Sequence, residues 1–463
     1  MNLALLGILA SSFAPGEAPP RPNVLFIISD DLNCDLNCYG ATWVKSPNLD
    51  RLAASGVRFN HAYVQYPVCN PSRTSFLTGL RPEKTRILGN NIHFRKNLPE
   101  VKTLPQWFRE HGYYTASLGK VFHRGLSPEE LRPDMDDPPS WDHRFYGQAT
   151  EAGKTGERRN MSGGKLPWCN WLAADCDDEG LQDGQTTKEA IRLMEAGKDK
   201  PWFIAIGFYR PHDPFHSPKK YFDLYPVEKM KLPPGFPAGG LPNAFTLPGG
   251  AFKSPFDSFT EDDKREFLRA YYAGLTYMDA QVGKLLDSLH RLRLEQNTVV
   301  VFLGDHGYEL GVRNWWNKNT LFEKSCRVPF LVRWPGAKGN GKTTQGIVEA
   351  IDIYPTLCEL AKVGAPSGLQ GESFARLLDD PAKLGKETAF TTVERGGARG
   401  LSLRTVRYRY TEWKGKETAA ELYDHNSDAG EVKNLAGDPA LKEIQLKLAL
   451  RLEQFRQQNE VKP

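Results

Sequence analysis

The chain has 463 residues, of which 40% are hydrophobic, 25% charged and 11% aromatic. This balance is typical of a folded globular protein and excludes a disordered or fibrous chain, and the length leaves room for one large and one smaller domain. The 60 basic and 56 acidic residues give a formal charge of +4 and are spread along the sequence, so no basic stripe indicates a nucleic acid or a membrane lipid as a partner.

An apolar run at the start of the chain, from Leu3 to Ala10, is followed by small residues. This order is typical of a signal peptide, although no Lys or Arg precedes Leu3, and it predicts residues 1–18 as the leader, with cleavage after Ala14 or Ala18. We therefore expect a secreted or periplasmic protein, or a lysosomal one in a eukaryote; the alternative is a disordered or trimmed N-terminus. The run is shorter than the roughly 20 apolar residues of a membrane span, and no other stretch is apolar enough to cross a membrane.

Seven cysteines are an odd number for an exported protein, so at least one thiol is expected to stay outside disulfides. Cys169 and Cys176 lie close together in a polar stretch and are candidates for a small-loop disulfide. Cys34 and Cys38 have a CxxxC spacing, but no second pair or nearby histidine cluster completes a zinc site, and we interpret them as structural. Cys69 is the candidate for the free thiol.

Continuous apolar runs predict strands that are buried on both faces. The first of them, Asn23–Ile28, leads into Ser29-Asp30-Asp31. A helix is expected next, with Ser46 as its N-cap, Pro47 in its first position and apolar residues recurring to Val57. Two further buried strands are predicted at Trp202–Phe208 and Val299–Gly304, with a helix between them at Tyr271–Leu289.

Strands that alternate with helices indicate a parallel sheet covered on both faces, and ligands of such folds bind beyond the carboxyl ends of the strands. Four polar residues lie at such ends: Asp30, Asp31, Asp305 and His306. The stretch 214–263 is rich in Pro, Gly and Phe and is expected to be a long surface excursion over the sheet. Active-site walls are often built in this way.

After about Gly371 the pattern changes to short strand-like pieces, 401–405 and 408–411, and then a polar helix from Ala440 to Gln457. The change predicts a smaller C-terminal α+β subdomain over residues 371–463, after a main domain over residues 22–370.

The strongest chemical signal is the run Val68-Cys69-Asn70-Pro71-Ser72-Arg73-Thr74-Ser75-Phe76-Leu77-Thr78-Gly79. It matches the CxPSR signature of the type I formylglycine-dependent sulfatases of the alkaline phosphatase superfamily, and the match extends well beyond the five core residues. The resemblance implies that a formylglycine-generating enzyme oxidises Cys69 to an aldehyde, whose hydrate attacks the sulfur of a sulfate ester. The other interpretation is an ordinary buried cysteine.

The same resemblance implies the fold. It is an α/β fold with a large mixed, mostly parallel sheet flanked by helices, in which the main domain is the catalytic one.

The aspartates at the strand ends suit a metal site. A hard divalent cation such as calcium prefers several oxygen ligands, and Asp30, Asp31 and Asp305 supply carboxylates. In isolation an Asp-Asp pair is more often a turn or a helix cap, but its position at a strand end favours a metal. The resemblance adds His306 and the hydrate formed from Cys69 to the ligands of one Ca²⁺ ion, which would lower the pKa of the attacking hydroxyl and neutralise sulfate charge.

Five basic residues match positions with which the family holds the sulfate. Arg73 would stabilise the hydrated aldehyde and the metal shell; Lys120 and His123 match a GKxxH motif, and His123 would help to break down the sulfated hydrate. His212, in a Pro-His-Asp-Pro-Phe run, and Lys318 match positions that contact sulfate oxygens and the leaving oxygen. Taken singly, each is more often a solvated or hydrogen-bonded surface group; the five together favour the catalytic interpretation.

Within the family the resemblance is closest to the iduronate-2-sulfatases and covers most of the chain from Asn23 to about Leu360. It implies a sulfated carbohydrate as the substrate, a 2-O-sulfated uronate or a related sugar, while algal or other polysaccharides stay open. The loop Asn91–Arg95 and the Phe-rich excursion are expected to contact the sugar. His93 or Arg95 would then meet a uronate carboxylate, unless they are solvated loop residues.

Two alternatives remain. Phosphonate monoester hydrolases and phosphodiesterases of the same superfamily share the fold, the metal site and sometimes the cysteine signature, but the GKxxH and PHxPF segments argue against them. A non-catalytic glycan-binding relative, or a protein whose Cys69 is never oxidised, would keep the pocket without the aldehyde; the complete set of predicted ligands argues against such a loss.

Overall fold

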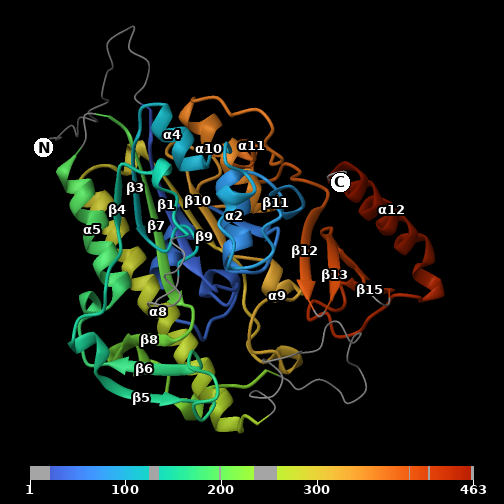
Figure 1. Ribbon diagram of the computed structural model, residues 1–463, viewed down its shortest axis with the longest axis horizontal. Helices are drawn as coiled ribbons and strands as arrows, with labels where there is room; N and C mark the ends of the chain where they lie inside the picture. Colours follow the sequence, from blue (N-terminus) through green and yellow to red (C-terminus); the bar gives the residue numbers. More distant parts are fainter. Residues whose placement is uncertain are drawn as a thin grey trace, which may run out of the picture.

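An eight-stranded sheet runs through the larger part of the molecule, with the strand order β11-β2-β10-β9-β1-β7-β3-β4 (Figure 1). The computed structural model describes residues 21–124, 135–197, 200–233, 258–395, 397–415 and 418–459. The strands are β1 (Asn23–Asp30), β2 (Val57–Tyr63), β3 (Tyr114–Gly119), β4 (His143–Phe145), β7 (Trp202–Pro211), β9 (Thr298–Gly304), β10 (Phe330–Arg333) and β11 (Thr343–Glu349). Only β10 runs antiparallel to its two neighbours among these pairs. The predicted large mixed, mostly parallel sheet is confirmed.

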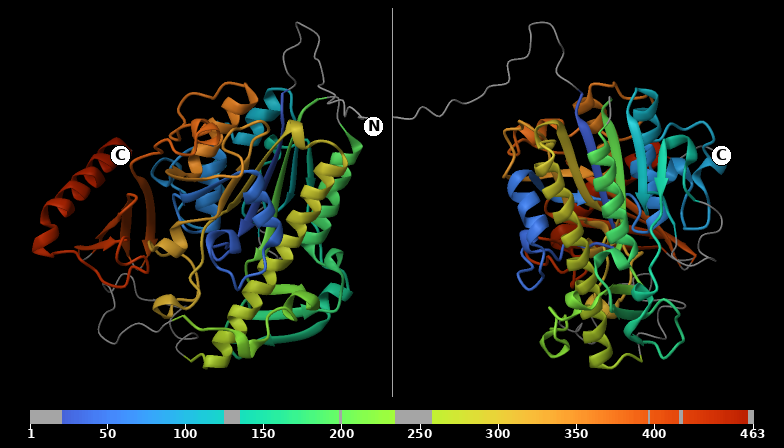
Figure 2. Two further views of the ribbon diagram at one scale, coloured as in Figure 1. Left: turned by 180° about the vertical axis from the view of Figure 1, so that it is seen from behind. Right: turned by 90° about the vertical axis from the view of Figure 1, so that its left-hand side faces the viewer.

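The central strand β1 is buried on both faces, and its side chains alternate between two hydrophobic clusters. Leu25 and Ile27 pack into the cluster that contains α1 (Pro47–Ser55), α5 (Gln182–Ala196) and α8 (Glu261–Arg291). Phe26 and Ile28 pack into the cluster that contains α2 (Cys69–Thr78), α4 (Leu104–Glu110) and α10 (Ile353–Ala361). Figure 2 shows α5 and α8 lying along one side of the sheet. Helices therefore cover both faces, as the apolar runs predict.

The two helix starts differ in how they are capped. Pro47 is the first residue of α1 and Ser46 holds the N-cap position, as predicted, but the Ser46 hydroxyl caps no amide of the helix and accepts from the amide of Asn37 instead. Helix α8 begins ten residues before the predicted Tyr271, because Thr260 caps it and forms a capping box with Asp263. Three acidic residues occupy the first turn of α8, where they favour the helix end electrostatically but interrupt the apolar periodicity on which the prediction depends.

The prediction of a surface excursion over residues 214–263 is wrong at its start. Phe215–Pro218 forms strand β8, which pairs in parallel with β6 (Asn170–Ala174), and β6 pairs with β5 (Gly156–Asn160) in a third, three-stranded sheet. The short helix α6 (Lys219–Phe222) follows. Phe215 is completely buried against Phe267 of α8, a tertiary contact that a proline-flanked four-residue strand does not reveal in the sequence. Residues 234–257 of the predicted excursion lie outside the described residues.

The C-terminal part forms an antiparallel four-stranded sheet, drawn in orange to red in Figure 1. Its elements are β12 (Ala389–Arg395), β13 (Ala398–Arg404), β14 (Tyr408–Lys414), β15 (Thr418–Asp424) and the helix α12 (Lys442–Asn459). The predicted strand pieces lie in β13 and β14, and the predicted polar helix is α12. The placement of a domain boundary near residue 370 stays a prediction.

The strand β12 docks directly on the segment that leads from β2 to Cys69. Thr391 Oγ1 donates to the carbonyl oxygen of Val64 at 2.6 Å, and the amide of Thr392 donates to that of Gln65 at 3.0 Å. The amide of Glu394 donates to the hydroxyl of Tyr66 at 2.9 Å. The two sheets therefore share a hydrogen-bonded junction beside Cys69.

A buried ion network joins the same two parts of the molecule. Glu323, in α9 (Glu323–Cys326), accepts from Arg409 at 2.5 Å and from Arg404 at 3.0 Å. Arg409 also pairs with Glu431 at 2.5 Å, and both of these side chains are 1% exposed. Burial opposes ionisation of Glu431, but the Arg409 guanidinium outweighs it and lowers the pKa of that carboxyl to about 2. The network thus holds ionised groups where water does not reach.

Replacing Arg409 with Met is expected to lower the melting temperature markedly, because removing one partner of a buried ion pair costs about 3–5 kcal/mol. Arg407→Met is the matched control, since Arg407 is 51% exposed and pairs only at the surface with Asp424. Thermal unfolding followed by circular dichroism measures both variants. Equal melting temperatures for the two variants would show that the network contributes nothing to docking.

No helix in the described ranges is long and apolar enough to cross a membrane. The predicted signal peptide, residues 1–18, lies outside those ranges. All seven cysteines are free thiols, so the predicted Cys169–Cys176 disulfide is not formed. These two residues flank β6, and an extended strand separates residues by about 3.3 Å each, so seven steps exceed the roughly 4.4–6.8 Å between the Cα atoms of a disulfide.

Candidate active site

The predicted site residues gather at the carboxyl ends of four neighbouring strands, in the order β9, β1, β7 and β3. Asp30 ends β1, and Asp305 and His306 follow β9. Lys120 follows β3, and His212 follows β7. The site thus occupies the edge at which ligands of such sheets bind.

Cys69 lies at the centre of this group, as the first residue of α2, and is completely buried. Its Sγ atom is 3.3 Å from Asp30 Oδ1, 3.3 Å from His306 Nε2 and 3.1 Å from Lys318 Nζ. The residue before the helix, Val68, provides no side-chain cap, so the positive end of the helix dipole favours negative charge at this position.

The signature residues that follow Cys69 fix it in place. Asn70 donates through Nδ2 to the carbonyl oxygens of Gly89 and Ile92, each at 2.9 Å. Ser72 donates through its hydroxyl to the carbonyl oxygen of Asp305. The sequence that identifies the cysteine therefore also anchors the first turn of α2 to the end of β9.

Arg73 extends the same connection with charge. Its Nε atom donates to Asp305 Oδ2 at 2.8 Å, and Nη1 donates to the carbonyl oxygen of Val121 at 3.0 Å. Both Arg73 and Asp305 are completely buried. One guanidinium thus ties α2 to the ends of β9 and β3.

Asp31 adopts the left-handed backbone conformation, with a φ of 61°, which is uncommon for a residue other than glycine and tends to occur at functional sites. Two contacts hold it there: its amide donates to Asp305 Oδ1 at 3.1 Å, and its carbonyl oxygen accepts from the hydroxyl of Tyr271 in α8 at 2.7 Å. The turn directs a second carboxylate, next to that of Asp30, into the site.

Two overlapping groups of side chains have ligand atoms within 4.8 Å of one another: Asp30, Cys69, Asp305 and His306, and Asp30, Asp31, Cys69 and His212. Within the described residues the buried Oδ2 of Asp31 accepts no hydrogen bond. Burial raises the pKa of Asp31 to about 7, although Lys318 and His306 act in the opposite direction. Three carboxylates in this arrangement fit a divalent cation that prefers oxygen.

Three cationic side chains balance these carboxylates in the structure. Lys318 Nζ is 2.6 Å from Asp31 Oδ1, and Lys120 forms an ion pair with Asp30. Burial disfavours the imidazolium of His306, but Asp305 and Cys69 outweigh burial and raise the pKa of His306 to about 9. The cluster is therefore rich in fixed positive charge around Cys69.

Of the other two predicted histidines, His212 belongs to the second of the two overlapping groups. His212 Nε2 is 3.8 Å from Asp31 Oδ2, and Nδ1 contacts the carbonyl oxygen of Asp213. His123 forms no hydrogen bond through its buried Nδ1 within the described residues. Burial and the Lys120 ammonium lower the pKa of His123 to about 3, and burial and Lys318 hold the pKa of His212 well below its usual value. Both imidazoles are therefore neutral near pH 7.

Sequence reasoning missed Asp213, although it lies inside the Pro-His-Asp-Pro-Phe run. Its carboxylate is 3.6 Å from His212 Nδ1 and 3.5 Å from the hydroxyl of Tyr308. Burial and the neighbouring Asp31 raise the pKa of Asp213 to about 7. A charged residue directly beside a candidate catalytic histidine was the available signal.

Of the two interpretations left open for His93 and Arg95, sugar contacts or solvated loop residues, the structure does not support the sugar contact. Arg95 uses its guanidinium on protein acceptors: Asp137 through Nε and Nη2, Gln106 through Nη2, and two backbone carbonyl oxygens through Nη1. His93 Nδ1 accepts from the amide of Arg95, and Nε2 is 2.9 Å from the carbonyl oxygen of Asp136. These side chains hold their own loop and leave no donor directed at a substrate.

Comparisons with known proteins agree with this geometry. A family model described as Sulfatase matches residues 22–363, and one described as N-sulphoglucosamine sulphohydrolase, C-terminal, matches residues 311–458. Because the first model covers well over half of the chain, the protein belongs to the sulfatase family and is a sulfuric ester hydrolase. Members of this family use a formylglycine and a metal ion.

The predicted likeness to the iduronate 2-sulfatases is confirmed. Iduronate 2-sulfatase of Mus musculus is 33% identical over an alignment of 509 residues, which covers 93% of this chain and 92% of that protein. Two solved structures share the fold: a phosphonate monoester hydrolase of Agrobacterium radiobacter (TM-score 0.79, 22% identity, 95% of this chain and 96% of that chain) and a 2-O GAG sulfatase (TM-score 0.71, 24% identity, 95% and 93%).

Proposed function

We propose that the protein hydrolyses a sulfate ester of a sulfated glycan, with a 2-O-sulfated uronate or a related sugar as the unit attacked. The observation that carries this proposal is the Cys69 side chain, held at a helix N-terminus among three carboxylates and the cations Lys120, Lys318 and Arg73. A relative at 33% identity is an iduronate 2-sulfatase, which supports the choice of sugar. Export, predicted from residues 1–18, would bring the protein to compartments in which such polymers occur.

The proposal includes two groups that are added to the chain. A formylglycine-generating enzyme would convert Cys69 to formylglycine, and one Ca²⁺ ion would be held by Asp30, Asp31, Asp305 and His306 together with that residue. When both are present, the hydrated aldehyde supplies an oxygen nucleophile and the cation supplies Lewis acidity.

The side chains around Cys69 have separable tasks. Lys318, 3.1 Å from Sγ, and Lys120 hold the sulfate oxygens and neutralise the charge that builds up on them and on the leaving oxygen. Arg73 fixes the position of residue 69 relative to Asp305. His212, neutral and directed at the site through Nε2, can accept and return a proton there, and His123 does the same during release of sulfate.

The overall reaction consumes one water molecule: the S–O bond to the sugar breaks, the sugar oxygen gains a proton, and sulfate leaves with the oxygen of water. A phosphonate monoester hydrolase shares the fold at 22% identity, so the corresponding phosphorus ester is the proper alternative substrate in every assay.

Conversion of Cys69 is expected to be visible by mass, because replacing a thiol with an aldehyde lowers the mass of its tryptic peptide by about 18 Da. Protein coexpressed with a formylglycine-generating enzyme should show this loss and release sulfate from a 2-O-sulfated uronate disaccharide. Cys69→Ala should fold and be inactive, while Cys358→Ala, which alters a buried cysteine of α10, should keep the activity. An active Cys69→Ala protein would refute the assignment of Cys69 as the nucleophile. If the aldehyde forms but the disaccharide is not hydrolysed, the proposal of a 2-O-sulfated uronate as the substrate unit is refuted.

Calcium removal is expected to lower both activity and melting temperature, because a ligand that binds only the folded state stabilises it by about 2.7 kcal/mol at a hundred times its Kd. EDTA-treated protein titrated with CaCl₂ in a thermal shift assay measures the effect. Asp31→Asn should abolish the response, whereas Asp35→Asn, which alters a carboxylate paired with Lys324, should retain it. A melting temperature that changes with neither EDTA nor calcium would argue against a bound ion.

Lys318→Ala and His212→Ala are expected to lower kcat by about a hundredfold or more, in the range found when a group that stabilises transition-state charge is removed. Lys324→Ala is the matched control. This lysine follows Lys318 by six residues, its side chain is 37% exposed, and it pairs with Asp35. Steady-state kinetics with the sulfated disaccharide, together with melting curves, separates catalysis from folding. Normal kinetics in both test variants would show that the sulfate subsite lies elsewhere.

A further inference from the structure

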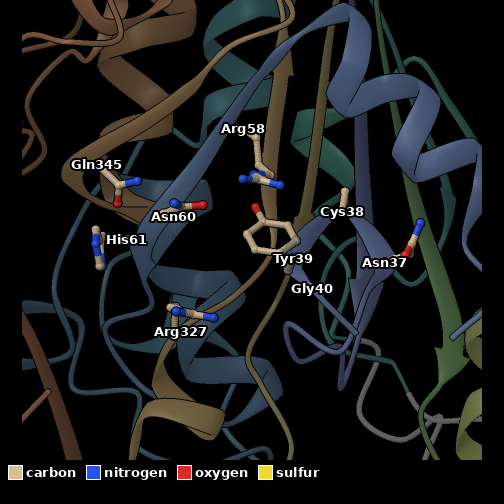
Figure 3. A pocket seen from close by; sticks show the side chains of 9 residues that line it. All are labelled: Asn37, Cys38, Tyr39, Gly40, Arg58, Asn60, His61, Arg327 and Gln345. Atoms are coloured by element: carbon tan, nitrogen blue, oxygen red, sulfur yellow. The ribbon is translucent and has the colours of Figure 1, made fainter. Parts of the chain in front are cut away.

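A polar cavity of about 460 Å³ lies beside Tyr39 (Figure 3). It is lined by Asn37, Cys38, Tyr39, Gly40, Arg58, Asn60, His61, Arg327 and Gln345. None of these is a predicted site residue, and the volume falls within the roughly 300–1,000 Å³ of small-ligand pockets. The cavity therefore needs an explanation that the catalytic site does not provide.

The cavity is built on the edge of the large sheet. Arg58, Asn60 and His61 belong to β2, Gln345 belongs to β11, and the residues 37–40 form the η1 turn (Asn37–Tyr39) and its C-cap. Phe59 faces the cluster that contains α2, so its neighbours Arg58 and Asn60 point to the opposite face of the strand. Figure 3 shows their side chains directed into the space beside Tyr39.

The lining carries positive charge and no carboxylate. Arg58 lies over the ring of Tyr39 at 5.4 Å, and its buried Nε has no hydrogen-bond partner in the described part of the chain. It forms no ion pair there either. Arg327 contributes a second guanidinium, which pairs with Glu323 at 3.7 Å and contacts the Cys34 side chain. Burial lowers the pKa of His61 to about 4, so this imidazole is neutral.

The other side chains add uncharged donors and acceptors around a rigid ring. Tyr39 is fixed because its hydroxyl donates to the carbonyl oxygen of Phe59 and accepts from the amide of Phe330. The amides of Asn60 and Gln345 offer donors and acceptors of the kind that sugar hydroxyls require. Guanidinium groups bind carboxylate and sulfate through paired, charge-assisted hydrogen bonds.

We infer that this cavity is an accessory binding site for an anionic, hydroxyl-bearing sugar unit, with Arg58 and Arg327 at its carboxylate or sulfate and Asn60 and Gln345 at its hydroxyls. The sugar identity rests on the proposed function. Two sources share this chemistry: another unit of the polymeric substrate, and a free unit released from it.

The cavity is connected to the catalytic centre through the backbone. The segment that carries Arg327 packs against Gly307, where a Cβ atom would lie 1.8 Å from the carbonyl oxygen of Lys324, and Gly307 directly follows His306. The turn 37–40 lies a few residues after Asp31. An occupant of the cavity would therefore be held by the loop that follows Asp31 and by a segment that packs against the loop carrying His306.

The test measures binding to the full chain by calorimetry in the presence of calcium. The ligands are a heparin-derived disaccharide and a heparin-derived octasaccharide, which are sulfated and contain uronate. Arg58→Gln is expected to weaken binding by about ten- to a hundredfold, the effect of losing a charged hydrogen bond. Gln345→Glu should weaken it as well, since it adds a negative charge without touching Arg58 or its ring contact. Arg51→Gln, at an exposed pair with Asp287, removes the same charge outside the cavity and should bind like the wild type.

The two sources give different outcomes. If the cavity variants weaken binding of the octasaccharide alone, the cavity is a subsite for the polymer. If they abolish a second binding event of the disaccharide, the cavity binds a released unit. Unchanged binding in both cavity variants, or an equal loss in Arg51→Gln, overturns the inference. If Arg58→Gln melts early, Gln345→Glu carries the test. Hydrolysis of a small aryl sulfate should be unaffected by the cavity variants; a wild type that hydrolyses no sulfate ester would refute the proposed function while leaving the binding result readable.

Discussion

The buried ion pair between Arg73 and Asp305 is the contact on which the site depends. Both side chains are completely buried, and the guanidinium also donates to the backbone after β3. Removing either partner would leave an uncompensated charge in the interior, which costs far more than the pair itself contributes. The two residues are therefore required together, and together they set the distance between the first turn of α2 and the end of β9.

That constraint explains why the residues after Cys69 matter as much as the cysteine. Ser72 and Arg73 both bind Asp305, one at its backbone and one at its carboxylate, while Asn70 binds the backbone of Gly89 and Ile92. A cysteine on a mobile loop would not keep its side chain within 3.3 Å of both Asp30 and His306. The rigid helix start gives the preorganisation that electrostatic catalysis requires, since no reorganisation is then needed during the reaction.

The sequence predicted the parts of the site that follow from strand ends and from local motifs. Asp30 and Asp305 follow continuous apolar runs, and parallel strands bring such ends to one edge. The sequence leaves a side chain's role open where its partner is distant: Arg95 is neutralised by Asp137, 42 positions away, and nothing local distinguishes it from a free cation. For the same reason β8 was missed, because its pairing with β6 is tertiary.

The C-terminal sheet positions two of the segments that form the site. Its edge strand β12 binds the backbone of Val64 and Gln65 and the hydroxyl of Tyr66, three residues before Cys69. The buried arginines of the same sheet hold Glu323, five residues after Lys318. The strands β12 to β14 thus position both the segment before Cys69 and the segment after Lys318.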